Sequence, residues 1–154
     1  EERAPLRGSQ ADGGPRVVYL SLPEAAGPQR WRTGLYEEVP SDGRPAAADD
    51  DAAHYRRVRE HPGEQLTSYL FRVAIPGKGN LWFVGSTLSK TAAGICCDYD
   101  DADVPEDVEA PWFVYDGSQW YETPGLKITP MPPAVAAALA KSKRKNAKLM
   151  SPRA

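Results

Sequence analysis

The sequence is poor in cysteine and histidine and contains no long hydrophobic run. Its two cysteines, Cys96 and Cys97, are adjacent. Neighbouring residues of an extended strand point to opposite faces, so these two are poorly placed to bond each other. We therefore expect two reduced thiols, one of them buried. This pattern excludes a disulfide framework and a cysteine-based metal site.

The absence of long apolar runs bears on membrane insertion. A spanning helix needs roughly 18 consecutive apolar residues, and no stretch approaches that length, so no transmembrane span is predicted. No signal-peptide pattern is visible, and the chain begins at Glu1. Removal of a targeting segment would explain that start, and import into an organelle, a chloroplast or mitochondrion, is the expectation that follows.

Recognisable catalytic motifs are missing too. Ser86 follows Gly85, but the second glycine of a nucleophile elbow is absent. His54 and His61 flank a charged stretch without a motif partner, and we expect both to be exposed. Nothing adjacent to the cysteines would lower a thiol pKa. The sequence therefore indicates no catalytic residue and no cofactor, and it predicts a protein without enzymatic activity.

Charge is abundant and unevenly distributed. The formal net charge is −2, yet the residues from Lys141 onward include six basic and no acidic ones, which leaves 13 basic against 21 acidic residues before them. This is an acidic domain with a cationic tail, and we expect the tail to bind other protein subunits. Nucleic acid or an anionic membrane surface are weaker alternatives, since the acidic body opposes a polyanion. The candidate docking residues are Lys141, Lys143, Arg144, Lys145, Lys148 and Arg153.

Composition divides the chain into three parts. Residues 1–16, rich in Gly, Pro and Arg, predict an extended N-terminal arm. Residues 17–129 form the expected β domain, with an acidic insertion at 46–53 and an acidic loop at 98–109. Residues 130–154 are a proline-rich linker followed by the basic tail. Within that tail, the alanine-rich stretch 134–149 lacks helix breakers and predicts a helix.

Short apolar patterns between Gly, Pro and Asp turns predict strands rather than helices in the middle of the chain. The strongest local signal is Asp116-Gly117, which separates two aromatic-rich runs and predicts a hairpin within 110–121. The highly charged stretch 54–60 should lie at a sheet edge, and residues 24–32 should be a loop anchored by Trp31. Further strands are expected at 17–22, 34–39, 68–75, 81–86, 94–97 and 126–128. The fold class is therefore mainly β, a small antiparallel sheet or barrel-like domain.

Several short motifs occur in a characteristic order. These are Gly43-Arg44-Pro45, then Trp82-Phe83-Val84-Gly85, then Trp112-Phe113-Val114-Tyr115-Asp116-Gly117, followed by Trp120. In that order they resemble a small β module of unassigned function found in proteins of marine algae, other protists and some invertebrates. The likeness covers residues 34–128 and is interrupted by the insertion, which leaves the path of the second and third strands open.

The resemblance transfers no catalytic residue and implies a display or docking unit. Together with the charged ends it suggests a non-enzymatic structural or accessory subunit of a larger complex, such as a photosynthetic or respiratory complex of an algal organelle. The alternative is a small ligand- or carbohydrate-binding module. For that function Trp82, Trp112, Trp120 and Tyr121 would form a stacking platform, although aromatic residues of small β domains more often fill the core.

The acidic loop 98–109 raises the question of calcium. Its carboxylates lie near the spacing of a twelve-residue calcium loop, with Glu109 at the last ligand position. However, Asp103 replaces the glycine of the sharp turn and Pro105 follows. These departures favour a solvated acidic loop, and no metal site is predicted.

Overall fold

The computed structural model describes residues 15–39, 54–59, 63–89 and 92–150, with the backbone alone at 144–150. Several predicted features lie outside these ranges. They are residues 1–14 of the N-terminal arm, the insertion 46–53, His61 and Arg153. The strands are β1 (Val17–Ser21), β2 (Gly34–Glu38), β3 (Tyr55–Arg57), β4 (Tyr69–Ile75), β5 (Gly79–Gly85), β6 (Ala93–Cys97), β7 (Trp112–Tyr115), β8 (Trp120–Glu122) and β9 (Lys127–Pro130). The helices are the 3-10 segments η1 (Glu24–Arg32) and η3 (Pro105–Asp107) and the α-helix α1 (Pro133–Met150).

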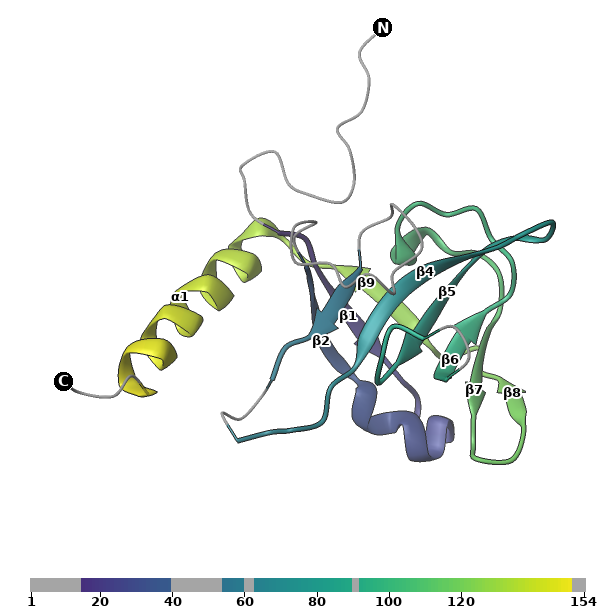
Figure 1. Cartoon of the computed structure of the whole chain (residues 1–154), viewed down its shortest axis with the longest axis horizontal. Coiled ribbons are helices and arrows are strands. Elements are labelled where there is room, and N and C mark those ends of the chain that lie inside the picture. Colours follow the sequence, from purple (N-terminus) through teal and green to yellow (C-terminus); the bar gives the residue numbers. More distant parts are fainter. Residues whose placement is uncertain (1–14, 40–53, 60–62, 90–91, 151–154) are drawn as a thin grey trace, which may run out of the picture.

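In the described residues the nine strands form one antiparallel sheet in the order β8-β7-β6-β5-β4-β3-β2-β1-β9. The sheet curls into a half-barrel, and α1 extends away from its side (Figure 1). The mainly β prediction is confirmed, and so are the hairpin around Asp116-Gly117 and the C-terminal helix. Pro130 is the last residue of β9, an edge strand, where a missing N–H is tolerated.

The two outermost strands of the sheet, β8 and β9, are consecutive in the sequence. Residues 123–126 connect them, and we call this segment the edge link. The amide of Thr123 donates to the carbonyl of Trp112 on β7 (2.8 Å), and the amide of Leu126 donates to the carbonyl of Thr123 (3.1 Å). Both side chains are buried. The edge link thus ties β9 back to β7 and packs into the core.

The core runs across the sheet as a row of directly opposed residues. Tyr55, Leu70, Val84, Ile95 and Val114 are register partners from β3 to β7 and are all buried. Residues in one such row share a face, here the concave face of the curled sheet. Successive side chains of a strand point to opposite faces, and this alternation produces the period-2 patterns in the sequence.

The predicted edge position of residues 54–60 is wrong. β3 lies inside the sheet, paired with β2 on one side and β4 on the other. Its charge is accommodated because Arg57 turns inward, forms an ion pair with Glu64 and lies 5.4 Å from the Trp31 ring. The expectation that His54 is exposed is also wrong, since its side chain is buried and its ring lies 6.4 Å from that of Tyr69.

Segment η1 is a 3-10 helix with a kink, not the expected loop, and its polar side chains fill one end of the half-barrel. The chain kinks at Gly27, where φ is 57°, a value that favours glycine. The buried guanidinium of Arg32 then donates to Gln29 Oε1 (2.7 Å) and to the hydroxyls of Ser68 (2.9 Å) and Ser86 (3.2 Å). It also lies 4.4 Å from the centre of the Trp31 ring. Burial lowers the pKa of Arg32, and neutral acceptors compensate for its desolvation.

The edge link gives a test of how strongly closure stabilises the fold. We expect Leu126→Ala to lower the free energy of unfolding by about 2–4 kcal/mol, because this side chain is only 7% exposed and its removal leaves a cavity. The matched control is Leu66→Ala, at a position 58% exposed, which should change stability by less than about 0.5 kcal/mol. Urea unfolding of both variants measures the difference, and equal costs would contradict a structural role for the edge link.

Candidate functional site

The acidic loop between β6 and β7 is organised by one of its own carboxylates. Asp100 accepts hydrogen bonds from the amides of Ala102 (2.9 Å), Glu109 (2.9 Å) and Ala110 (3.0 Å). Its own amide donates to the carbonyl of Asn80 at the start of β5 (2.8 Å). Burial acts to raise the pKa of Asp100, but the three amides outweigh it and hold the pKa below the usual 3.8. The loop that was predicted to be solvated is therefore held in place by hydrogen bonds from its own backbone amides to Asp100.

A second carboxylate of this loop reaches into the half-barrel. Glu106, on η3, forms an ion pair with Arg16, and Arg16 also donates to the hydroxyl of Tyr55 (2.7 Å). Burial acts to lower the pKa of Arg16, yet Glu106 and Tyr55 together raise it. Burial also raises the pKa of Tyr55. Arg16, the last residue of the predicted extended arm, thus connects β3 to η3.

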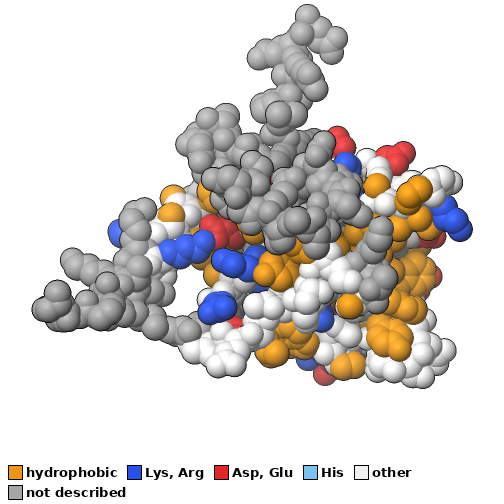
Figure 2. Space-filling view, viewed as in Figure 1, with side chains coloured by type: hydrophobic (Ala, Val, Ile, Leu, Met, Phe, Trp, Pro, Cys, Tyr) orange, Lys and Arg blue, Asp and Glu red, His pale blue; other side chains and the backbone are white. Residues whose placement is uncertain are grey.

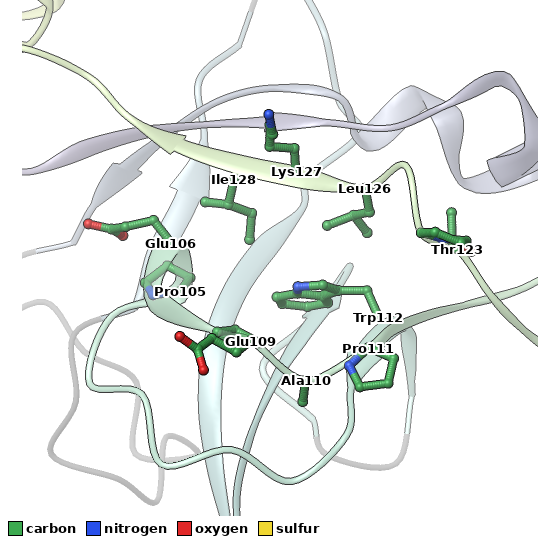
Figure 3. Close-up of a pocket in the computed structure, with 12 residues that line it drawn as sticks. Pro105, Glu106, Glu109, Ala110, Pro111, Trp112, Thr123, Leu126, Lys127 and Ile128 are labelled. Atoms are coloured by element: carbon green, nitrogen blue, oxygen red, sulfur yellow. The ribbon is translucent and has the colours of Figure 1, made fainter.

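These contacts leave a pocket of about 410 Å³ between η3, β7, the edge link and β9. Figure 3 shows the indole of Trp112 pointing from β7 towards Leu126 and Ile128. Glu106 and Glu109 lie on either side of Pro105, and their carboxylates point away from the indole (Figure 3). A volume of this size is typical of small-molecule sites. The pocket has an apolar wall, and the two glutamates lie at its margin.

One oxygen of Glu106 has no hydrogen-bond partner among the residues that the structure describes. Its side chain is only 6% exposed, and Oε2 is engaged by Arg16, whereas Oε1 is buried without a hydrogen bond. A buried acceptor left unpaired costs free energy comparable to a lost hydrogen bond. Among the described residues that line the pocket, Glu106 Oε1 is the buried side-chain oxygen that lacks a hydrogen-bond partner.

The aromatic residues proposed as a ligand platform do not form one exposed face. Trp82 is completely buried, and its indole N–H donates to the carbonyl of Ala102 (3.1 Å). Trp112 is buried apart from the part that lines the pocket. Trp120 and Tyr121 are 44% and 48% exposed, but they are adjacent in β8 and so face opposite sides of the sheet. Trp120 packs against Tyr115, with the ring centres 5.2 Å apart.

Both cysteines are free thiols, Cys97 buried and Cys96 half-buried. Burial raises the pKa of Cys96 to about 11 and that of Cys97 to about 12. The amide of Trp82 lies 3.2 Å from Cys97 Sγ, which only partly offsets this effect. Neither thiol is therefore activated as a nucleophile.

The candidate docking residues lie on or beyond α1. Lys141 and Lys143 are exposed, and Lys143 forms an ion pair with Glu37 on β2. Arg144, Lys145 and Lys148 continue the helix backbone. In Figure 2, several Lys and Arg side chains gather beside α1, whereas hydrophobic side chains are concentrated on the opposite side of the view.

Comparison with known proteins gives no family assignment. The chain matches no protein-family model, no curated protein and no solved structure. Within the described ranges no helix is both long and apolar enough to cross a membrane. In the same residues, no group of three or more His, Cys, Asp or Glu side chains is placed to hold a metal ion.

The sequence pointed to the acidic loop and to Trp112 but missed how they combine. Arg16, Glu106 and Ile128 come from three distant segments, and no motif links them. The alternation of Leu126, Lys127 and Ile128 was the available signal, since it places the two apolar side chains on one face.

The role of Asp100 can be tested by its removal. We expect Asp100→Ala to lower the free energy of unfolding by about 1–2 kcal/mol, because three amides lose their acceptor. Asp101→Ala, at an exposed neighbouring position, is the control and should cost less than about 0.5 kcal/mol. Because the folded-state pKa of Asp100 is lowered, its contribution is present above pH 3.8 and is lost as the pH falls. We therefore expect the difference in melting temperature between the wild type and Asp100→Ala to shrink from pH 5 to pH 2. A difference in melting temperature that does not change with pH would contradict this account.

The raised thiol pKa values predict slow alkylation of the folded protein. For Cys96 a rise from 9.0 to about 11 reduces the thiolate fraction about 100-fold at neutral pH, and the greater nucleophilicity of a more basic thiolate recovers part of that loss. We expect iodoacetamide at pH 7.5 to react with both cysteines at least tenfold more slowly than in the urea-unfolded chain. Mass spectrometry over time measures both rates, and rapid labelling of the folded chain would show that a thiol is activated.

Proposed function

We propose that this chain is a non-enzymatic accessory protein that docks onto a neighbouring protein through its basic C-terminal helix. The observation that carries the proposal is the placement of α1, which extends away from the half-barrel (Figure 1) and bears the exposed Lys141 and Lys143. The helix is anchored at its start, where Ala136 is buried, and by the ion pair between Lys143 and Glu37. A rigid body with a projecting cationic element is suited to binding an acidic surface.

The partner class follows from charge. The residues before Lys141 carry an excess of acidic side chains, which disfavours nucleic acid and anionic membranes relative to a protein with a local acidic patch. The resemblance noted above extends the proposal to a complex of an algal organelle. A sugar-binding face made of exposed tryptophans has less support, because Trp120 and Tyr121 lie on opposite faces of β8.

The test compares two pairs of lysine substitutions. We expect Lys141→Gln with Lys145→Gln to weaken partner binding about tenfold, since two charge contacts of about 0.5–1 kcal/mol each are lost. Glutamine retains the helix propensity of lysine, so α1 should persist. The matched control is Lys78→Gln with Lys127→Gln, two exposed lysines outside the helix, which should bind as the wild type does.

The measurement has two stages. Affinity purification of the full chain from its native source identifies the partner, and the dissociation constants of the wild type and both variants are then measured on the purified partner at two salt concentrations. Weaker binding of the helix variant at low salt supports the proposal. Equal binding by both variants, or binding only to nucleic acid or anionic vesicles, would refute it.

A further inference from the structure

We propose that the outer edge of β8 binds an extended peptide with basic residues at alternate positions. The peptide would add to the sheet as a further strand beside β8. This inference is independent of docking through α1, because it uses another element and the opposite charge on the partner. It rests on three features of β8: outward-facing backbone groups, exposed aromatic side chains, and a carboxylate that forms no ion pair with the described residues.

The backbone of β8 presents hydrogen-bonding groups on its outer side. β8 is the last strand at its end of the sheet and pairs with β7 on its inner side (Figure 1). The amide of Thr123 donates to the carbonyl of Trp112 on β7 (2.8 Å), so Thr123 faces that strand. In an antiparallel pair, the backbone groups of successive residues point alternately towards and away from the partner strand. Tyr121 therefore also faces β7, whereas the N–H and C=O groups of Trp120 and Glu122 point outward.

The two outermost strands differ in how their edges are protected. At β9, Pro130 lacks an N–H, and η3 contacts this strand. β8 contains no proline, and the side chains of all 3 of its residues are exposed. An edge with free backbone groups and exposed aromatic side chains is a template for another strand. Of the two edges of the described sheet, the one at β8 is therefore suited to strand addition.

Side chains on the convex face select the charge of the added strand. Phe71, Phe83, Cys96 and Phe113 are register partners from β4 to β7, and this row ends at Glu122 on β8. Glu122 is the charged member of the row, and it forms no ion pair with the described residues. In an added strand, the residue opposite Glu122 would take the next place in the row. A basic side chain at that place would pair with the carboxylate.

Trp120 selects a second basic residue. It lies two positions before Glu122 and so on the same face of β8. Its ring packs against Tyr115, with the ring centres 5.2 Å apart, and the side chain is still 44% exposed. The face of an indole attracts a cation. The residues 112–122 of the hairpin include Asp116 and Glu122 and no basic residue. Local charge therefore favours a basic strand over an acidic one.

Matched peptides test the charge requirement on the full chain. The probes are acetylated and amidated peptides of sequence Thr-Arg-Val-Arg-Thr, Thr-Gln-Val-Gln-Thr and Thr-Glu-Val-Glu-Thr. We expect the arginine peptide to bind with a dissociation constant of about 0.1–1 mM. The glutamine peptide should bind about tenfold more weakly, and the glutamate peptide should not bind at about 10 mM. Two-dimensional ¹H–¹⁵N NMR would show binding through the amide signals of Trp120 and Glu122. Equal affinity for the arginine and glutamine peptides, or no shift of these two signals, would overturn the proposal.

Methylation of the peptide backbone separates strand addition from general charge attraction. In an antiparallel arrangement, the two arginines would exchange hydrogen bonds with Trp120 and Glu122, whereas the N–H of the central valine would point away from β8. N-methylation of either arginine should therefore abolish binding. N-methylation of the valine should change the affinity less than about twofold, since it removes no hydrogen bond to β8. All these peptides carry the same charge, so equal binding of the methylated forms would refute pairing at this edge.

Substitutions locate the bound peptide. Glu122→Gln should weaken binding of the arginine peptide about fivefold, and Glu122→Lys should reverse the preference between the arginine and glutamate peptides. Trp120→Thr should also weaken binding of the arginine peptide about fivefold, because the cation loses the indole. Asp101→Asn, at an exposed carboxylate outside the hairpin, is the charge control and should bind as the wild type does. An unchanged preference in Glu122→Lys would place the peptide elsewhere and refute the assignment.

Glu122→Pro removes an outward N–H without removing a bond to β7, and it should abolish peptide binding. If this variant does not fold, the methylated peptides make the same test on the wild-type chain. Size-exclusion chromatography tests the other occupant of the edge, a second copy of this chain. A dimer that the arginine peptide does not dissociate would refute the proposal. The helix variant Lys141→Gln with Lys145→Gln should bind the peptide normally, which separates this inference from the proposed docking.

Discussion

The short connection between the two outermost strands determines the shape of this protein. If the nine strands lay flat, β8 and β9 would be separated by eight interstrand spacings, or about 38 Å. The chain between Glu122 and Lys127 spans at most about 18 Å even when fully extended. The sheet must therefore curl until its edges approach each other. The edge link also carries Leu126 into the core, so closure and burial reinforce each other.

A curled, incompletely closed sheet has openings that side chains must fill, and polar groups fill two of them here. At one opening Arg32 is held by hydroxyl and amide oxygens beneath Trp31. At the seam, Arg16 and Glu106 form an ion pair beside Tyr55. Buried charges contribute to stability only when they are paired and hydrogen-bonded. Among the described residues, each end keeps a buried atom without a hydrogen bond: Arg57 Nε beside Trp31, and Glu106 Oε1 at the seam.

Local patterns were sufficient for the strands and for α1, because alternation and helix propensity act within a few residues. These patterns gave a wrong position for a strand whose charged side chain is paired with residues elsewhere in the fold. The charged stretch around Arg57 suggested an edge strand, but Glu64 and Trp31 compensate the guanidinium and allow β3 to lie inside the sheet. The pocket was beyond reach for the same reason. Glu106, at its margin, pairs with Arg16 across 90 residues, and curvature rather than sequence spacing brings these two residues together.

The acidic loop and the basic helix are both runs of like charge in the sequence, yet the fold uses them differently. In the loop, two carboxylates make contacts within the protein: Asp100 accepts hydrogen bonds from three backbone amides, and Glu106 forms an ion pair with Arg16. In the helix, both Lys141 and Lys143 are exposed, and Lys143 also forms an ion pair with Glu37. A carboxylate that braces backbone is constrained in position, whereas an exposed lysine keeps its conformational freedom until a partner binds. The two charged segments therefore differ in role within the fold: the carboxylates of Asp100 and Glu106 hold other parts of the chain in place, whereas Lys141 remains exposed at the surface.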